Sequence, residues 1–123
     1  MKFRTEIPPL KILPQVDHQT KLVSLGSCFS EEIGQKLKVN LFPVTLNPFG
    51  VLYNPQSVSN AILIGMEKLK ITDEDLVEQG GLYHSFYHHS SHSALSEEAL
   101  RYNIQQSIQQ TNEALKTADI IYL

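Results

Sequence analysis

The chain has 123 residues, enough for one domain with its own hydrophobic core. Its composition, 41% hydrophobic and 19% charged, excludes a disordered or a fibrous protein. With a net charge of -3 and ten scattered Lys and Arg residues, the chain lacks the concentrated basic surface that nucleic acid or an anionic membrane would select as a partner.

Residues 1–20 predict an extended N-terminal segment, because prolines recur in it as far as Pro14. The first nine residues contain an acid and two prolines where a signal peptide needs an unbroken apolar run. No segment approaches the roughly 20 apolar residues of a membrane span. The single cysteine, Cys28, cannot form an internal disulfide. We therefore expect a cytoplasmic protein.

A strand and a helix are predicted directly after this segment. Lys21–Leu25 is mostly apolar and is ended by Gly26, which is typical of a short strand. Ser30, followed by two acids, predicts the start of a helix, and Ile33 and Leu37 supply its apolar face.

A second strand is predicted at residues 41–46, although Pro43 interrupts it, and Asn47–Gly50 has the composition of a loop. Asn54-Pro55 predicts the start of another helix, because Asn caps a helix well and Pro suits the first helical position. The expected buried stripe of this helix consists of Val58, Ala61, Ile62 and Met66.

Thr72–Asp75 has the pattern of a capping box and predicts a short helix that ends at Gly80-Gly81. A longer helix is predicted from Ser96 onward, because its apolar residues recur at helical spacing. These residues are Leu100, Ile104, Ile108 and Leu115. Residues 118–123 then have the apolar pattern of a buried strand.

The alternation of strands and helices favours an α/β fold with a mainly parallel sheet. Chain termini normally lie outside the core, but this sequence ends on a strand of buried character. We therefore expect residues 1–123 to be an incomplete, N-terminal portion of a longer protein. The open edge of the last strand would then favour self-association of these residues.

The turn after the first strand is the strongest candidate for a functional centre. A strand that leads through glycine into a helix places a side chain at the carboxyl end of the sheet, where helix N–H groups stabilise negative charge. Cys28 would lie at that helix end, which favours the reactive thiolate. The adjacent Ser27 would need a base to accept its proton. The alternative is an ordinary strand–helix turn with a small buried cysteine.

Three motifs follow one another along the chain. The first is Leu25-Gly26-Ser27-Cys28-Phe29-Ser30; the other two are Asn47–Pro55, with the sequence NPFGVLYNP, and Tyr83–Ser90, with the sequence YHSFYHHS. Together they resemble the GSCFA family, with Ser30 where the family name has Ala. That family is similar to the SGNH/GDSL hydrolases. The resemblance implies a three-layer α/β sandwich with a mainly parallel, flavodoxin-like sheet, of which residues 21–123 are the N-terminal part.

The resemblance also implies roles for residues of the turn. Aligned with the Gly-Asp-Ser of SGNH hydrolases, Gly26-Ser27-Cys28 places Cys28 at the nucleophile position and Ser27 at the Asp position. This departure implies a thiol nucleophile, a nucleophile shifted to Ser27, or a site that has lost hydrolysis.

The loop after the second strand would correspond to the hydrolases' second block, whose glycine N–H donates to the oxyanion. Gly50, with Asn47 beside it, is the implied oxyanion group, and Gly26 is the third residue expected to bind the oxyanion or the substrate. Alternatively, the Asn-Pro pairs are turn and cap residues only. SGNH enzymes take their base from an Asp-x-x-His near the C-terminus, and residues 1–123 contain no such sequence.

Four of the five histidines cluster at His84, His88, His89 and His92. The resemblance favours His84 and His89 as a base or as substrate contacts near Cys28. A zinc site is the second interpretation, because His84, His88 and His92 would share a face if the stretch were helical. The third is a polar loop with hydrogen-bonded imidazoles. We expect no cofactor.

The sequence thus favours an SGNH-like hydrolase or acyltransferase that acts on a small-molecule or carbohydrate ester, with neither nucleic acid nor membrane as partner. The alternative is a non-catalytic binding or scaffolding domain that keeps the hydrolase fold. The replaced serine and the missing base both motivate this alternative.

Overall fold

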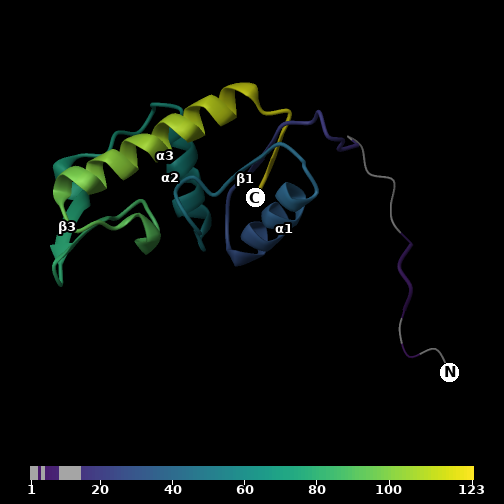
Figure 1. Ribbon diagram of the computed structural model, residues 1–123, viewed down its shortest axis with the longest axis horizontal. Coiled ribbons are helices and arrows are strands. Elements are labelled where there is room, and N and C mark those ends of the chain that lie inside the picture. Colours follow the sequence, from purple (N-terminus) through teal and green to yellow (C-terminus); the bar gives the residue numbers. More distant parts are fainter. Residues whose placement is uncertain (1–2, 4, 9–14) are drawn as a thin grey trace.

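The computed structural model describes residues 3, 5–8 and 15–123 (Figure 1). Part of the expected extended segment 1–20 therefore lies outside the described residues. In chain order the elements are β1 (Leu22–Ser24), α1 (Cys28–Val39), β2 (Val44–Leu46), α2 (Pro55–Gly65), η1 (Asp73–Asp75), β3 (Leu76–Gln79), β4 (Leu82–Ser85), η2 (Ser90–His92), α3 (Glu97–Thr117) and β5 (Ile120–Tyr122). The predicted α/β class is confirmed.

Strands β2, β1 and β5 form a parallel sheet in that order. Leu22 of β1 lies opposite Val44 of β2 and Ile120 of β5. The chain therefore steps from β1 to β2 on one side and later returns to the other side of β1. The carboxyl ends of β1 and β5 lie side by side where this direction reverses, which makes that end of the sheet a topological switch point.

Helices cover both faces of β1. Val23 and Leu25 on one face pack against Ala114 of α3 and against Val58 and Ile62 of α2. The opposite face meets α1, where the Ser24 hydroxyl donates to the carbonyl of Ser30. Figure 1 shows α1 on one side of β1 and the pair α2–α3 on the other.

Helix α1 begins at Cys28, two residues earlier than Ser30, because the hydroxyl of Ser27 accepts the N–H of Phe29 as a cap. The predicted apolar face is also wrong at Ile33, which is 36% exposed. The helix instead presents Ser30 and Gly34 to the sheet. A side chain at Gly34 would overlap Leu46, so the absence of a Cβ permits the close approach of α1 and β2.

The two predicted helices form as α2 and α3, and they pack against each other. Asn54 caps α2 and Ser96 caps α3. Met66 ends α2 and is 46% exposed, so it does not belong to the buried stripe. The stripe of α3 includes polar residues that apolar periodicity does not reveal. One of these, Thr111, is fully buried and lies where a Cβ on Gly65 would be.

The predicted helix from Thr72 to Gly80-Gly81 is wrong beyond its first turn. The carboxylate of Asp75 accepts the N–H and the hydroxyl of Thr72, but only the single turn η1 follows. The chain then forms the antiparallel hairpin β3–β4, with Gly80-Gly81 as its two-residue turn. Both glycines have positive φ, 61° and 78°, the backbone that such a hairpin turn requires.

The two outer strands of the parallel sheet are short. β2 begins only after Pro43, whose carbonyl accepts the N–H of Leu22. β5 pairs with β1 alone within the described residues, and Leu123, which follows it, is 72% exposed. Among the described helices, none combines the length and the hydropathy that crossing a membrane requires.

Candidate functional site

The turn between β1 and α1 lies at the carboxyl end of the sheet. Gly26 has a φ of 149°, and a Cβ there would lie 2.7 Å from the Ser30 hydroxyl oxygen. Ser27 follows in extended conformation, and its Oγ accepts the N–H of Phe29 at 3.3 Å. Cys28 is a free thiol, exposed at the first residue of α1. The two candidate nucleophiles are thus both accessible at the start of a helix.

Asn47 connects this turn to the loop after β2. Its side chain is buried, and its Oδ1 accepts the N–H of Gly26 at 2.9 Å. Its Nδ2 donates to a carboxylate oxygen of Glu31 in α1 at 2.8 Å, and its own N–H donates to the carbonyl of Ser24. A single residue, Asn47, therefore fixes the ends of β1 and β2 and the first turn of α1 relative to one another.

Gly50 completes the same loop. Its N–H donates to the carbonyl of Asn47 at 2.8 Å, and its φ is 79°. A Cβ at Gly50 would overlap His89, whose N–H donates to the carbonyl of Phe49. The glycine therefore permits the histidine-rich loop to pack on the Asn47–Gly50 turn, and in this conformation its N–H is used within the turn.

A pocket of about 640 Å³ opens beside the β1–α1 turn. It is bounded by the ends of β1 and β5, by the segment after Gly50 and by one face of α2. Ser27 lines it, whereas Cys28 does not. Other residues of its wall include Leu25, Leu52, Tyr53, Ile62 and Leu123. The hydroxyl of Ser27 is therefore the candidate nucleophile that borders the pocket.

The two histidines favoured as a base do not contact the nucleophiles. His84 lies in β4, where its Nδ1 is 2.7 Å from the hydroxyl of Ser93. His89 precedes η2 and its Nδ1 accepts the N–H of Ser91. Within the described residues, no hydrogen bond joins an imidazole to Ser27 or Cys28, and no histidine lines the pocket beside Ser27. His89 instead packs on the Asn47–Gly50 turn, at Gly50.

His88 is the most buried histidine of the cluster. Its ring stacks on Phe49 at 4.3 Å between centroids, and its two nitrogens lie 2.9 Å from Ser85 Oγ and 2.7 Å from Ser107 Oγ. Ser107 donates its hydroxyl proton to the carbonyl of Ile104, so Nε2 of His88 carries a proton and donates to Ser107. Burial, reinforced by neighbouring His92, lowers the pKa of His88 to about 3.

The helical face on which a zinc site would depend does not form. His84 lies in a strand, and His92, in η2, donates from Nε2 to the carbonyl of Pro48. Partial burial lowers the pKa of His92. In the described part of the chain, no group of three or more His, Cys, Asp or Glu side chains is placed to hold a metal ion.

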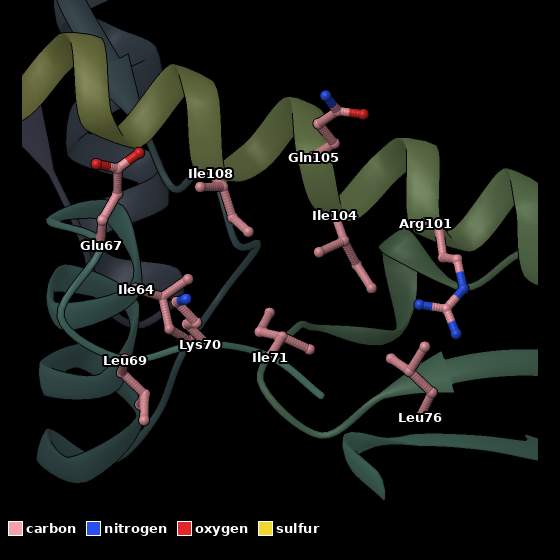
Figure 2. A pocket seen from close by; sticks show the side chains of 10 residues that line it. All are labelled: Ile64, Glu67, Leu69, Lys70, Ile71, Leu76, Arg101, Ile104, Gln105 and Ile108. Carbon is pink, nitrogen blue, oxygen red and sulfur yellow. The ribbon is translucent and has the colours of Figure 1, made fainter. Parts of the chain in front are cut away.

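A second pocket, of about 720 Å³, lies away from the β1–α1 turn, between α3 and the segment after α2 (Figure 2). Its floor is aliphatic, with Ile64, Ile71 and Ile104 in view, and Arg101 and Lys70 are among its charged lining residues. Arg101 also pairs with Asp73 and Glu97. This pocket contains none of the residues of the three sequence motifs.

Sequence reasoning missed three contributors to these networks, namely Glu31, Ser85 and Ser107. Glu31 was interpreted only as an acid in the first helical turn, although its carboxylate holds Asn47. Ser85 and Ser107 lie more than twenty positions apart, and neither the 3.6-residue nor the 2-residue period marks them as partners of one imidazole. The sequence feature that could have identified Glu31 as part of the site is its position one helical turn after Ser27.

Comparison with known proteins gives one match. The model of the GSCFA family matches residues 21–123, which span all three motifs and every described helix and strand. No curated protein and no solved structure matches the chain.

Proposed function

The chain belongs to the GSCFA family, and on that premise we propose that it is an SGNH-like hydrolase or acyltransferase acting on an ester or acyl group. Its sheet order, β2-β1-β5, corresponds to the first three strands of a flavodoxin-like sheet. We propose that residues 21–123 are the N-terminal part of such a three-layer sandwich.

The observation that carries the proposal is the position of Ser27 and Cys28. They follow the central strand at the switch point between β1 and β5, which is where open parallel sheets bind ligands. Ser27 lines the adjacent pocket, and Cys28 is exposed rather than buried in the core. An ordinary structural cysteine would be expected in the interior.

The reaction would proceed in two steps. The hydroxyl of Ser27 or the thiol of Cys28 attacks the acyl carbonyl carbon and gives its proton to a base. The bond to the leaving alkoxide then breaks, and the alcohol leaves with that proton. Water, or an acceptor alcohol in a transferase, attacks the acyl-enzyme, releases the acyl product and restores the side chain. N–H groups at the start of α1 would stabilise the oxyanion.

Ester hydrolysis by variants of the turn tests the proposal. If Ser27 is the nucleophile, both Ser27→Ala and Ser27→Asn should lower kcat for aryl esters about a thousandfold or more. Asn keeps the capping oxygen, so it separates loss of the nucleophile from loss of the helix cap. If Cys28 attacks, Cys28→Ala should show that loss instead. Ser90→Ala, an exposed serine in η2, is the matched control.

A second candidate function, a non-catalytic binding or scaffolding domain, has its own supporting observation. The N–H of Gly50, the amide of Asn47 and the Oγ of Ser27 all have hydrogen-bond partners within the turn network. Hydrolysis that survives every substitution at Ser27 and Cys28, or the lack of hydrolysis across a panel of aryl esters, would favour this candidate over the enzyme.

A further inference from the structure

The pocket beside Ser27 has a distinctive chemistry. Most of its wall is contributed by aliphatic or aromatic side chains, including Val58, Ile62 and Leu63 of α2. No charged side chain of the described residues lines it. An anionic or cationic ligand would therefore lose its hydration there without gaining a counter-charge.

The side-chain amide and the Gly26 peptide groups of this wall are engaged elsewhere. The side-chain oxygen of Asn54 accepts the N–H of Ser57, and the N–H of Gly26 donates to Asn47. The carbonyl of Gly26 accepts the N–H of Leu52. Hydroxyl groups come from Ser27, Ser30, Tyr53 and Ser59, but aliphatic and aromatic side chains outnumber them in the wall. A sugar presents several hydroxyl groups that each need a partner, and those that face the apolar part of the wall would have none. The wall therefore matches a hydrocarbon group better than a carbohydrate.

The second pocket provides the contrast. Its volume is similar, but Glu67, Lys70 and Arg101 contribute charges to its lining (Figure 2). Charge is thus absent from the pocket that adjoins the candidate nucleophile and present in the pocket that does not.

We propose that the pocket beside Ser27 holds the acyl chain of the substrate, and that this chain is uncharged and aliphatic. This inference rests on the proposed acyl-transfer function. The ester carbonyl would lie at Ser27, and the chain would extend along the face of α2 that carries Val58 and Ile62. The volume of about 640 Å³ lies within the range of small-molecule sites. Burial of each methylene contributes about 0.8 kcal/mol in such a site.

The test measures binding separately from catalysis. The probe is 2-octanone, an uncharged ketone with an aliphatic tail that cannot be hydrolysed, titrated into isotope-labelled protein and followed by amide NMR shifts. Acetone and glucose are compared at the same concentrations. Ser59→Asp places a carboxylate in the pocket wall at an exposed position of α2. Gln105→Asp, in the second pocket, is the matched control.

We expect 2-octanone to shift the amides of residues 58–63 and to bind more tightly than acetone or glucose. Ser59→Asp should weaken its binding at least tenfold, whereas Ser59→Asn and Gln105→Asp should leave it unchanged. Shifts confined to the second pocket, equal binding of glucose, or insensitivity to Ser59→Asp would overturn the inference.

Kinetics with aryl acetate and aryl octanoate separate this inference from the function on which it rests. A higher kcat/KM for the octanoate, lost in Ser59→Asp, supports both. Hydrolysis of the two esters at equal kcat/KM would overturn the inference that the pocket holds the acyl chain, but it would support the proposed hydrolase activity. Binding of 2-octanone without any hydrolysis leaves an apolar pocket but overturns the acyl-transfer function, and with it the assignment of the ligand as a substrate chain.

Discussion

Replacement of Asn47 by alanine is expected to lower the free energy of unfolding by about 3 kcal/mol. The substitution leaves the buried N–H of Gly26 without its acceptor and the carboxylate of Glu31 without its donor. It also places an ordinary residue at a φ of 41°, a left-handed conformation that Asn tolerates better than Ala. Urea unfolding followed by circular dichroism gives the free energy.

Two further variants separate these causes. Asn47→Gly removes the side chain, but glycine adopts the left-handed backbone without strain. The decrease in the free energy of unfolding of this variant therefore measures the side-chain hydrogen bonds alone. Asn47→Asp keeps an acceptor for Gly26 but places a second carboxylate against Glu31. The loss of stability of this variant should therefore become smaller as the pH falls toward 4, because protonation removes the repulsion between the two carboxylates. An Asn47→Ala protein as stable as the wild type, within about 0.5 kcal/mol, would show that Asn47 does not hold the three segments together.

Acidification is expected to destabilise the protein through His88. Its pKa is about 3 in the folded state against an ordinary value of 6.5, so between these values the unfolded chain binds a proton that the folded chain does not. The contribution of His88 is therefore fully present above pH 6.5 and is lost as the pH falls toward 3. The slope approaches about 1.4 kcal/mol per pH unit. The lowered pKa of His92 acts in the same direction.

The free energy of unfolding between pH 7 and pH 5 measures this slope, since most carboxylates stay ionised there. His88→Gln should be less stable than the wild type at pH 7, because a buried, stacked ring is lost. As the pH falls, the free energy of unfolding of this variant should nonetheless decrease less steeply than that of the wild type. The difference in slope should correspond to about one bound proton. Equal slopes for the two proteins would mean that His88 is charged in the folded state, contrary to its burial against Phe49.

The strand–turn–helix around Gly26 could be predicted because its signals are local. An apolar run, a glycine and a polar residue followed by acids are contiguous in the sequence, and the structure differs in where the helix begins and in which of its residues are buried. The resemblance of the three motifs to the GSCFA family is confirmed by the family match over residues 21–123, whereas the functional centre at this turn stays a prediction.

The hairpin after η1 was missed for a physical reason. Gly-Gly ends a helix and also forms the two-residue turn of a hairpin, and the sequence leaves both open. Pairing across the strands decides between them, since Val77 lies opposite His84 and Tyr83 also bridges to Ala94. A prediction that considers only the pattern of neighbouring residues cannot detect such pairs.

The separation of the histidines from the turn could not be predicted either. His84 and His89 belong to the third motif and Ser27 to the first, and the resemblance of both motifs to one family suggests one site. Their positions depend on contacts with partners far away in the sequence, above all the packing of His89 on Gly50. His89 packs on Gly50 and donates its N–H to the carbonyl of Phe49, and Asn47 of the same turn accepts the N–H of Gly26.

Trapping of the acyl-enzyme tests the central claim most directly. The protein is mixed with an aryl octanoate, quenched in acid within the first turnover, digested with trypsin and analysed by mass spectrometry. We predict an octanoyl group on the peptide spanning residues 22–36, at Ser27 or Cys28. Octanoyl groups found only on other peptides, or none at all while the aryl leaving group is released, would contradict the claim that this turn carries the nucleophile.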